Sequence, residues 1–114
     1  MAHYAISIAK SNLEKAKQDL RSAREQAILD IETSWSNLTG SLDQSKVQTA
    51  LLEAARQRND EANIRYESGL LTYDGWEIIV SDRVGLERSA IQAQLNVAIA
   101  EATWEKALGK QLEE

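Results

Sequence analysis

Side chains that could carry out catalysis or hold a metal ion are few in this chain. It has 114 residues, with a single histidine, His3, and no cysteine, so thiolate nucleophiles, thiolate metal ligands and disulfides are absent. The acidic residues Glu32, Asp43 and Glu53 do not repeat as the inward Glu-x-x-His pairs that a di-metal site between helices needs. No phosphate-binding glycine loop or nucleophile motif is visible. We therefore expect no enzyme activity, no metal ion and no cofactor.

Apolar side chains gather instead around one turn, in the stretch RYESGLLTYDGW at residues 65–76. Two interpretations of these side chains stand side by side. In one, Leu70 folds back on the end of the preceding helix, and Tyr73 and Trp76 pack inside the fold. In the other, some of this apolar surface stays outside the fold, because Leu70 and Leu71 cannot both fold inward.

The rest of the chain consists mainly of helix-forming residues. It has no proline and only five glycines, so little in it stops a helix. Gly69 is suited to end one helix in a left-handed conformation. Thr72 or Asp74 can cap the next, and Asp74 with Glu77 has the spacing of a capping box. The prediction is an all-α fold: one antiparallel helical hairpin over residues 1–114, with helices at about 5–67 and 74–112 and a turn at 68–73.

Apolar residues in the first predicted helix step by three and four. The stripe comprises Ile6, Ala9, Leu13, Ala16, Leu20, Ala23, Ala27 and Ile31 and continues through Trp35, Leu38 and Leu42. It resumes at Val47, so it moves around the helix near Gly40 and Ser41. Such a phase change marks either a loop or a stutter in a continuous helix, and we favour the stutter because one glycine costs a helix only about 1 kcal/mol.

The second predicted helix carries two apolar seams. One comprises Ile79, Leu86, Ala90, Ala93, Val97, Trp104 and Leu108, and the other comprises Trp76, Val80, Val84, Ile91, Leu95, Ala98 and Ala102. A polar line that includes Arg83 and Glu87 runs between them. Two seams predict two neighbouring helices, and the hairpin supplies only one. Since roughly 25 residues at the start of the chain also lack a partner within the hairpin, we expect self-association, for example as an antiparallel dimer.

Charge and hydropathy argue against nucleic-acid binding and against a membrane-spanning helix. The formal net charge is −5, and nucleic-acid binding needs a concentrated basic surface, so no nucleic acid is expected. The longest apolar runs are far shorter than the roughly 20 residues that cross a bilayer.

The pattern A-x-x-R-Y-x-x-G-L, from Ala62 to Leu70, and the closing A-L-G at 107–109 resemble the periplasmic helical hairpin of TolC-like outer-membrane efflux channels. The run from Ala27 to Trp35 agrees with the long helix of that family. The resemblance covers about residues 25 to 110 and implies one structural repeat of the tunnel wall. It also implies that the full-length protein is a homotrimer in a Gram-negative outer membrane, and that this chain is a piece of it without the barrel strands.

The resemblance implies partners and a gate as well. The turn would be the periplasmic tip, which meets a periplasmic adaptor protein and through it, indirectly, an inner-membrane transporter of a tripartite efflux or type I secretion pump. The residues that would dock the adaptor are Gly69, Leu70, Leu71, Thr72 and Tyr73. Tyr66 matches a position linked to closing the tunnel aperture. The family's inward-facing aspartates fall here on Gly75 and Ile78, so Asp74, Glu77 and Asp82 are the remaining candidates for an aperture ring.

Two other functions stay open from the sequence. A self-contained structural coiled-coil scaffold would explain the helices without any channel. The hairpin of an adaptor protein is also a long coiled coil, although the R-Y-x-x-G-L turn and the A-L-G ending favour the channel side.

Overall fold

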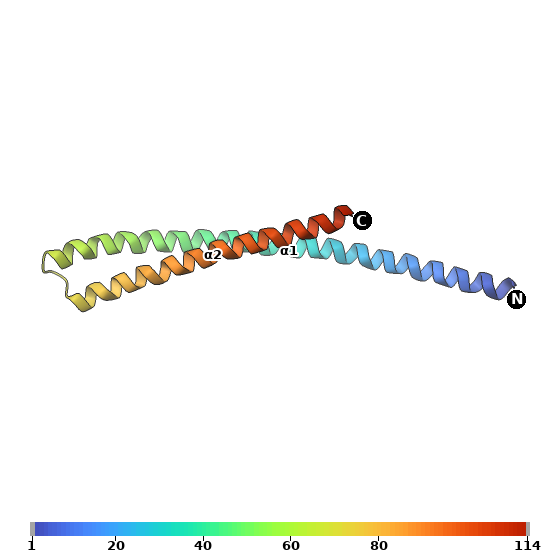
Figure 1. The fold of residues 1–114 in the computed structure, drawn as a ribbon, viewed down its shortest axis with the longest axis horizontal. Helices are drawn as coiled ribbons and strands as arrows, with labels where there is room; N and C mark the ends of the chain where they lie inside the picture. The colour runs from blue at the N-terminus through green and yellow to red at the C-terminus, as the bar shows by residue number, and fades with distance from the viewer. Residues whose placement is uncertain (1, 114) are drawn as a thin grey trace.

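The protein is a single hairpin of two long α-helices (Figure 1). The computed structural model describes the backbone of residues 2–113 and the side chains of residues 2–109. Helix α1 spans Ala2–Glu67 and helix α2 spans Tyr73–Glu113, and no strand occurs in the described residues. The expected all-α helical hairpin is confirmed, with boundaries within a few residues of those predicted.

Helix α1 is continuous through its central glycine, because Gly40 keeps a negative φ and the chain offers no proline to interrupt the hydrogen-bond ladder. A loop near residues 40–41, the alternative that the shifting apolar stripe allowed, is therefore excluded.

Gly69 ends α1 in a left-handed conformation, with φ at 76°. The Leu70 N–H donates to the carbonyl of Arg65 at 2.8 Å, and the Gly69 N–H donates to the carbonyl of Tyr66 at 3.1 Å. These two bonds form a Schellman motif, which satisfies carbonyls at the end of the helix.

Thr72 is the N-cap of α2. Its Oγ1 accepts a hydrogen bond from the Gly75 N–H at 3.1 Å, three residues into the helix. Of the two predicted caps, Asp74 is therefore wrong: it lies within the first turn of α2, where its negative charge complements the helix dipole instead.

Helix α2 covers only the second part of α1, so the molecule is a rod of 99 × 22 × 14 Å with an uncovered end. Trp35 and Trp104 lie across the hairpin with ring centroids 5.1 Å apart. Since residue numbers on antiparallel helices run in opposite directions, this register places the end of α2 near residue 26. Residues 2–26, called the arm below, project beyond α2 (Figure 1). No helix in the described part of the chain is long and apolar enough to cross a membrane.

Candidate functional site

Small and polar residues make up much of the interface between the helices. The α1 residues that face α2 recur by threes and fours: Ala27, Ile31, Ser34, Leu38, Ser41, Ser45, Gln48, Leu52, Ala55, Asn59 and Ala62. Their partners on α2 are Trp76, Ile79, Arg83, Leu86, Ala90, Ala93, Val97, Ala100, Trp104 and Ala107. All these side chains are buried or half-buried. The first predicted seam of α2 thus faces α1, and Leu108 beside it is half-buried too.

Only part of the apolar stripe predicted for α1, including Ala27, Ile31 and Leu38, lies within this interface. Trp35, Leu42, Val47 and Leu51 are between 42% and 52% exposed. The facing line instead passes through Ser41 without a change of phase. Small polar side chains pack well where two antiparallel helices lie close together. The positions that face α2 are therefore not the positions with the largest apolar residues.

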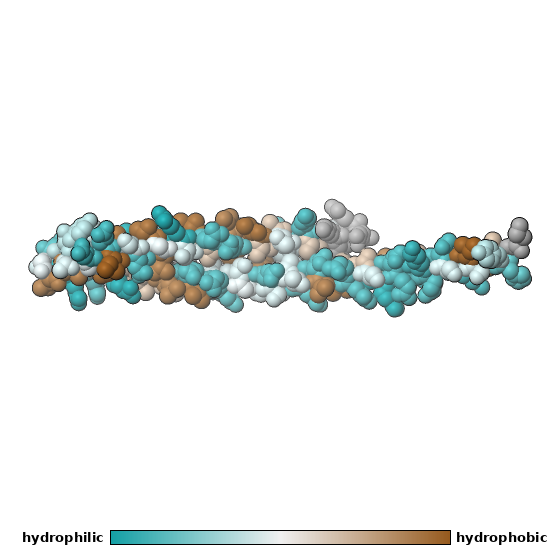
Figure 2. All heavy atoms as spheres, turned by 90° about the horizontal axis from the view of Figure 1, so that it is seen from below, coloured by the Kyte–Doolittle hydropathy of each residue, from teal (hydrophilic) through white to brown (hydrophobic). Residues whose placement is uncertain are grey.

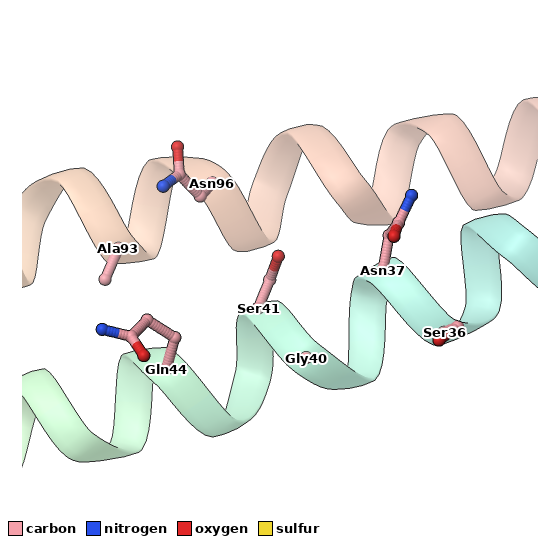
Figure 3. A pocket seen from close by; sticks show the side chains of 7 residues that line it. All are labelled: Ser36, Asn37, Gly40, Ser41, Gln44, Ala93 and Asn96. Carbon is pink, nitrogen blue, oxygen red and sulfur yellow. The ribbon is translucent and has the colours of Figure 1, made fainter.

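A shallow groove of about 350 Å³ lies between the two helices (Figure 3). Asn37 and Ser41 point from α1 toward α2, and Ala93 points back toward α1. Gly40 has no side chain there and nothing within 4 Å of where one would begin. The other lining residues are Ser36, Gln44 and Asn96. The groove carries no ionisable side chain, so it offers no group for acid–base catalysis.

Polar contacts fix the register of the two helices. Arg83 Nε donates to Asn59 Oδ1 at 3.2 Å, and its guanidinium also binds Glu87 at 2.7 Å. Closer to the turn, Trp76 Nε1 donates to Asn63 Oδ1 at 2.8 Å. Arg83 was expected on a polar line between the seams, yet it lies within the interface because Asn59 supplies an acceptor there. Neither contact was visible from hydrophobic periodicity.

Three aromatic rings pack together beneath the turn. Tyr66 stacks on Trp76 with centroids 5.2 Å apart and planes inclined by 21°. Tyr73 contacts both, at 6.2 Å from Tyr66 and 5.9 Å from Trp76. Trp76 therefore belongs to the hairpin interface and not to the outer seam of α2, to which the helical wheel had assigned it. Tyr66, the candidate gate residue, is part of the same cluster.

The two tip leucines take opposite roles. Leu71 is half-buried against the first turn of α2, where its Cδ1 lies 3.0 Å from the place a Cβ on Gly75 would occupy. Leu70 is 79% exposed, the most exposed large hydrophobic side chain in the described part of the chain. Tyr73 is 55% exposed. Gly69 and Thr72 hold the turn itself, and Leu70 and Tyr73 are the tip residues that expose large apolar side chains.

Two apolar residues near the tip, neither of them among the predicted docking residues, are exposed as well. Ile64 is 65% exposed and Ile78 is 70% exposed. Figure 2 shows hydrophobic side chains at the tip end of the rod as well as along its flanks. In the sequence, both are isoleucines that belong to none of the predicted apolar stripes or seams.

The acidic gate candidates Asp74, Glu77 and Asp82 are all exposed. Asp82 pairs with Arg58 at 3.3 Å, with both side chains at least half exposed, so the pair contributes little to stability. In the part of the chain that the structure describes, no three His, Cys, Asp or Glu residues converge in a group that could hold a metal ion.

The outer face of α2 is exposed along its middle. Ile91 and Leu95 of the second seam are 66% and 51% exposed, and Ile99 beside them is 56% exposed. Val80 and Val84, nearer the turn, are half-buried. The middle of this face therefore carries apolar side chains that α1 does not cover.

The chain matches no model of a known protein family, no curated protein and no solved structure. The tip and the outer face of α2 both expose large apolar side chains.

Proposed function

We propose that this chain is a periplasmic tunnel segment of a TolC-like outer-membrane efflux channel, and that its tip docks a periplasmic adaptor protein. The observation that carries the proposal is the tip itself. Leu70 is 79% exposed on a turn that a left-handed glycine holds in place. Burying an exposed leucine in a partner is worth about 1.5–3 kcal/mol. An exposed leucine at the end of a stiff rod is well placed to gain that energy by docking.

The length of the hairpin supports the proposal. A rod of 99 Å carries its tip far from the other end of the molecule. A tunnel wall that bridges a periplasmic space needs helices of this length. On this reading the tip would meet the adaptor, and the adaptor would in turn connect the channel to an inner-membrane transporter.

The two-sided character of α2 also supports it. One face packs on α1, and the face with Ile91 and Leu95 is free to contact a neighbouring hairpin. Helices in a closed ring need such contacts on two sides, as the full-length homotrimer would provide. Tyr66 and the acidic residues Asp74, Glu77 and Asp82 would then lie near the narrow end of the tunnel, as candidates for its gate.

The proposal can be tested by drug or toxin export in the source organism with the full-length protein carrying Leu70→Asp. The matched control is Leu70→Met, which keeps an apolar side chain of similar size on the same turn. Leu71→Asp is a poorer probe, because Leu71 packs against α2 and its loss would disturb the turn. Trimer formation and membrane insertion are measured for each variant.

We expect Leu70→Asp to abolish or strongly reduce export with the trimer intact, and Leu70→Met to retain it. Unchanged export by Leu70→Asp would mean that this leucine docks nothing, and the tip assignment would be withdrawn.

A self-contained structural scaffold is the second candidate. The observation in its favour is that the arm and the outer face of α2 are both apolar and both uncovered, so copies of the chain can cover one another.

A further inference from the structure

Two exposed apolar seams remain without a partner, one on the arm and one on α2. On the arm, Ile6, Leu13 and Leu20 are 54–57% exposed and alternate with Ala9, Ala16 and Ala23. On α2, the exposed seam is Ile91, Leu95, Ala98 and Ala102. Both step by threes and fours, the spacing at which two helices interdigitate in a coiled coil.

The two seams match in register when the helices run parallel. With Leu13 beside Leu95, the four central layers are Ala9 with Ile91, Leu13 with Leu95, Ala16 with Ala98, and Leu20 with Ala102. All four are apolar. The outer layers, Ile6 with Arg88 and Ala23 with Glu105, place an aliphatic side chain against a long charged one whose methylene groups can pack on it.

Charges that flank the seams complement each other in the same register. In a parallel coiled coil, a residue that directly precedes a seam residue on one helix pairs with a residue of the other helix. That second residue directly follows a seam residue and lies about five positions further along in the shared register. The six flanking pairs are Lys10 with Glu87, Lys17 with Gln94, Arg24 with Glu101, Ala5 with Gln92, Asn12 with Ile99, and Asp19 with Lys106. Three of the six join opposite charges, and none joins like charges. Glu87 already binds Arg83 within its own chain, so its carboxylate would be shared.

From these matches we propose that two copies of this chain form an antiparallel dimer, in which the arm of each copy lies along the outer face of α2 of the other. Symmetry makes the contact occur twice. This inference concerns contacts of the chain with itself and does not depend on the proposed channel.

The lengths of the helices fit this arrangement. On a helical wheel, the arm seam lies on the same face of α1 that the chain's own α2 covers from Ala27 to Ala62. The partner's α2 would therefore cover the arm on that same face. At 1.5 Å per residue, the register above places the two tips about 115 Å apart. The chain's own α2 ends near residue 26 of α1 and the partner's α2 would end near residue 31, so the last five or so residues of the two α2 helices would lie beside each other at the centre of the dimer.

Pairing of two arms is the main alternative, and the charges oppose it. Antiparallel arms would place large residues opposite alanines, for example Leu13 against Ala16 of the second copy. However, Lys10 would then face Arg24, and Lys17 would face its own copy. Paired arms would also form one contact instead of two and leave Ile91 and Leu95 exposed. Their two tips would lie about 160 Å apart.

The first test is the mass and maximum dimension of the chain, from light scattering and small-angle X-ray scattering at up to about 200 µM, a concentration that would detect even a weak dimer. We expect a dimer with a maximum dimension near 115 Å. A monomer with the 99 Å length of the single chain would overturn the proposal. A dimer of about 160 Å would overturn it in favour of paired arms.

The second test exchanges one pair of charges. Arg24→Glu and Glu101→Arg should each raise the Kd of the dimer by about three- to tenfold, because each change puts like charges together at two symmetric places. The double variant should recover most of the affinity. Both side chains are exposed and away from the hairpin interface, so the fold itself should be unaffected.

The charge exchange also separates the two dimers. If the arms paired with each other, Arg24→Glu would tighten the dimer by placing a glutamate against Lys10, and Glu101→Arg would have no effect. Either result would refute the proposal.

Cysteine cross-linking gives a third readout without background, since the chain has no cysteine. The variant Ala16→Cys/Ala98→Cys should form disulfide-linked dimers rapidly. The matched control, Ala16→Cys/Ser89→Cys, carries its second thiol on another side of α2 and should link far more slowly. Equal rates for the two variants would contradict the register.

Discussion

Gly69→Ala adds a single methyl group but should lower the free energy of unfolding of the hairpin. The Gly69 φ of 76° lies in the left-handed region, where a residue with a Cβ pays roughly 1–2 kcal/mol. No atom lies within 4 Å of where the Cβ would be, so steric collision with other residues adds nothing. Alanine also restricts the unfolded chain, which offsets about 0.4–1 kcal/mol of the cost. We expect Gly69→Ala to lower the free energy of unfolding by about 1 kcal/mol.

Gly40→Ala and Gly85→Ala are the matched controls. Both glycines lie inside helices with a negative φ and open space at the Cβ position. The same substitution should therefore raise stability there by about 1 kcal/mol, because alanine favours the helix. The difference in sign isolates the effect of backbone conformation from that of side-chain size.

Urea unfolding followed by circular dichroism, at one fixed protein concentration, measures all three variants. A fixed concentration matters because self-association would add to the apparent stability. If Gly69→Ala proved as stable as the parent chain, or more so, the left-handed turn would not be the element that ends α1, and the account of the tip would fail.

Three further substitutions test the contacts that hold the hairpin together. Thr72→Ala removes the cap of α2 and should cost about 1 kcal/mol in urea unfolding. Asn59→Leu leaves Arg83 without one of its acceptors and should lower the free energy of unfolding by about 1–3 kcal/mol. The double variant Asn59→Leu/Arg83→Leu should recover much of this loss. If the costs of the two single substitutions were additive, the two side chains would not interact. Trp76→Phe removes the hydrogen bond to Asn63 and should lower the thermal midpoint by several degrees, a result that an unchanged midpoint would contradict.

The fold could be predicted from the sequence because few residues decide it. Without proline, and with one glycine suited to a left-handed turn, the chain has one natural place to reverse direction. Gly69 and Thr72 mark that place on either side. The uncovered start of α1 followed from the same observation, because the two helices have unequal lengths.

The faces of the helices were harder to predict. Trp35 and Val47 stand out in the sequence but remain largely exposed, while Asn59 is buried. Where two helices pack closely, a small or hydrogen-bonded residue can replace a large apolar one. Hydrophobic periodicity does not detect such positions, although the unbroken spacing by threes and fours from Ala27 to Ala62 would have located them.

The same limit applies at the tip. The sequence established that Leu70 and Leu71 could not both fold inward, but it did not indicate which one stays outside. In the structure Leu71 packs against the first turn of α2 beside Gly75, whereas Leu70 stays exposed.

The most direct test of the proposed docking function is photo-crosslinking in living cells, with a photoreactive amino acid at position 70 of the full-length protein. Position 88, an exposed site on α2 away from the tip, is the control. The account predicts that position 70 crosslinks to a periplasmic adaptor protein and that position 88 does not. If position 70 formed no adaptor crosslink although the channel assembled and exported normally, the tip would not be the docking surface.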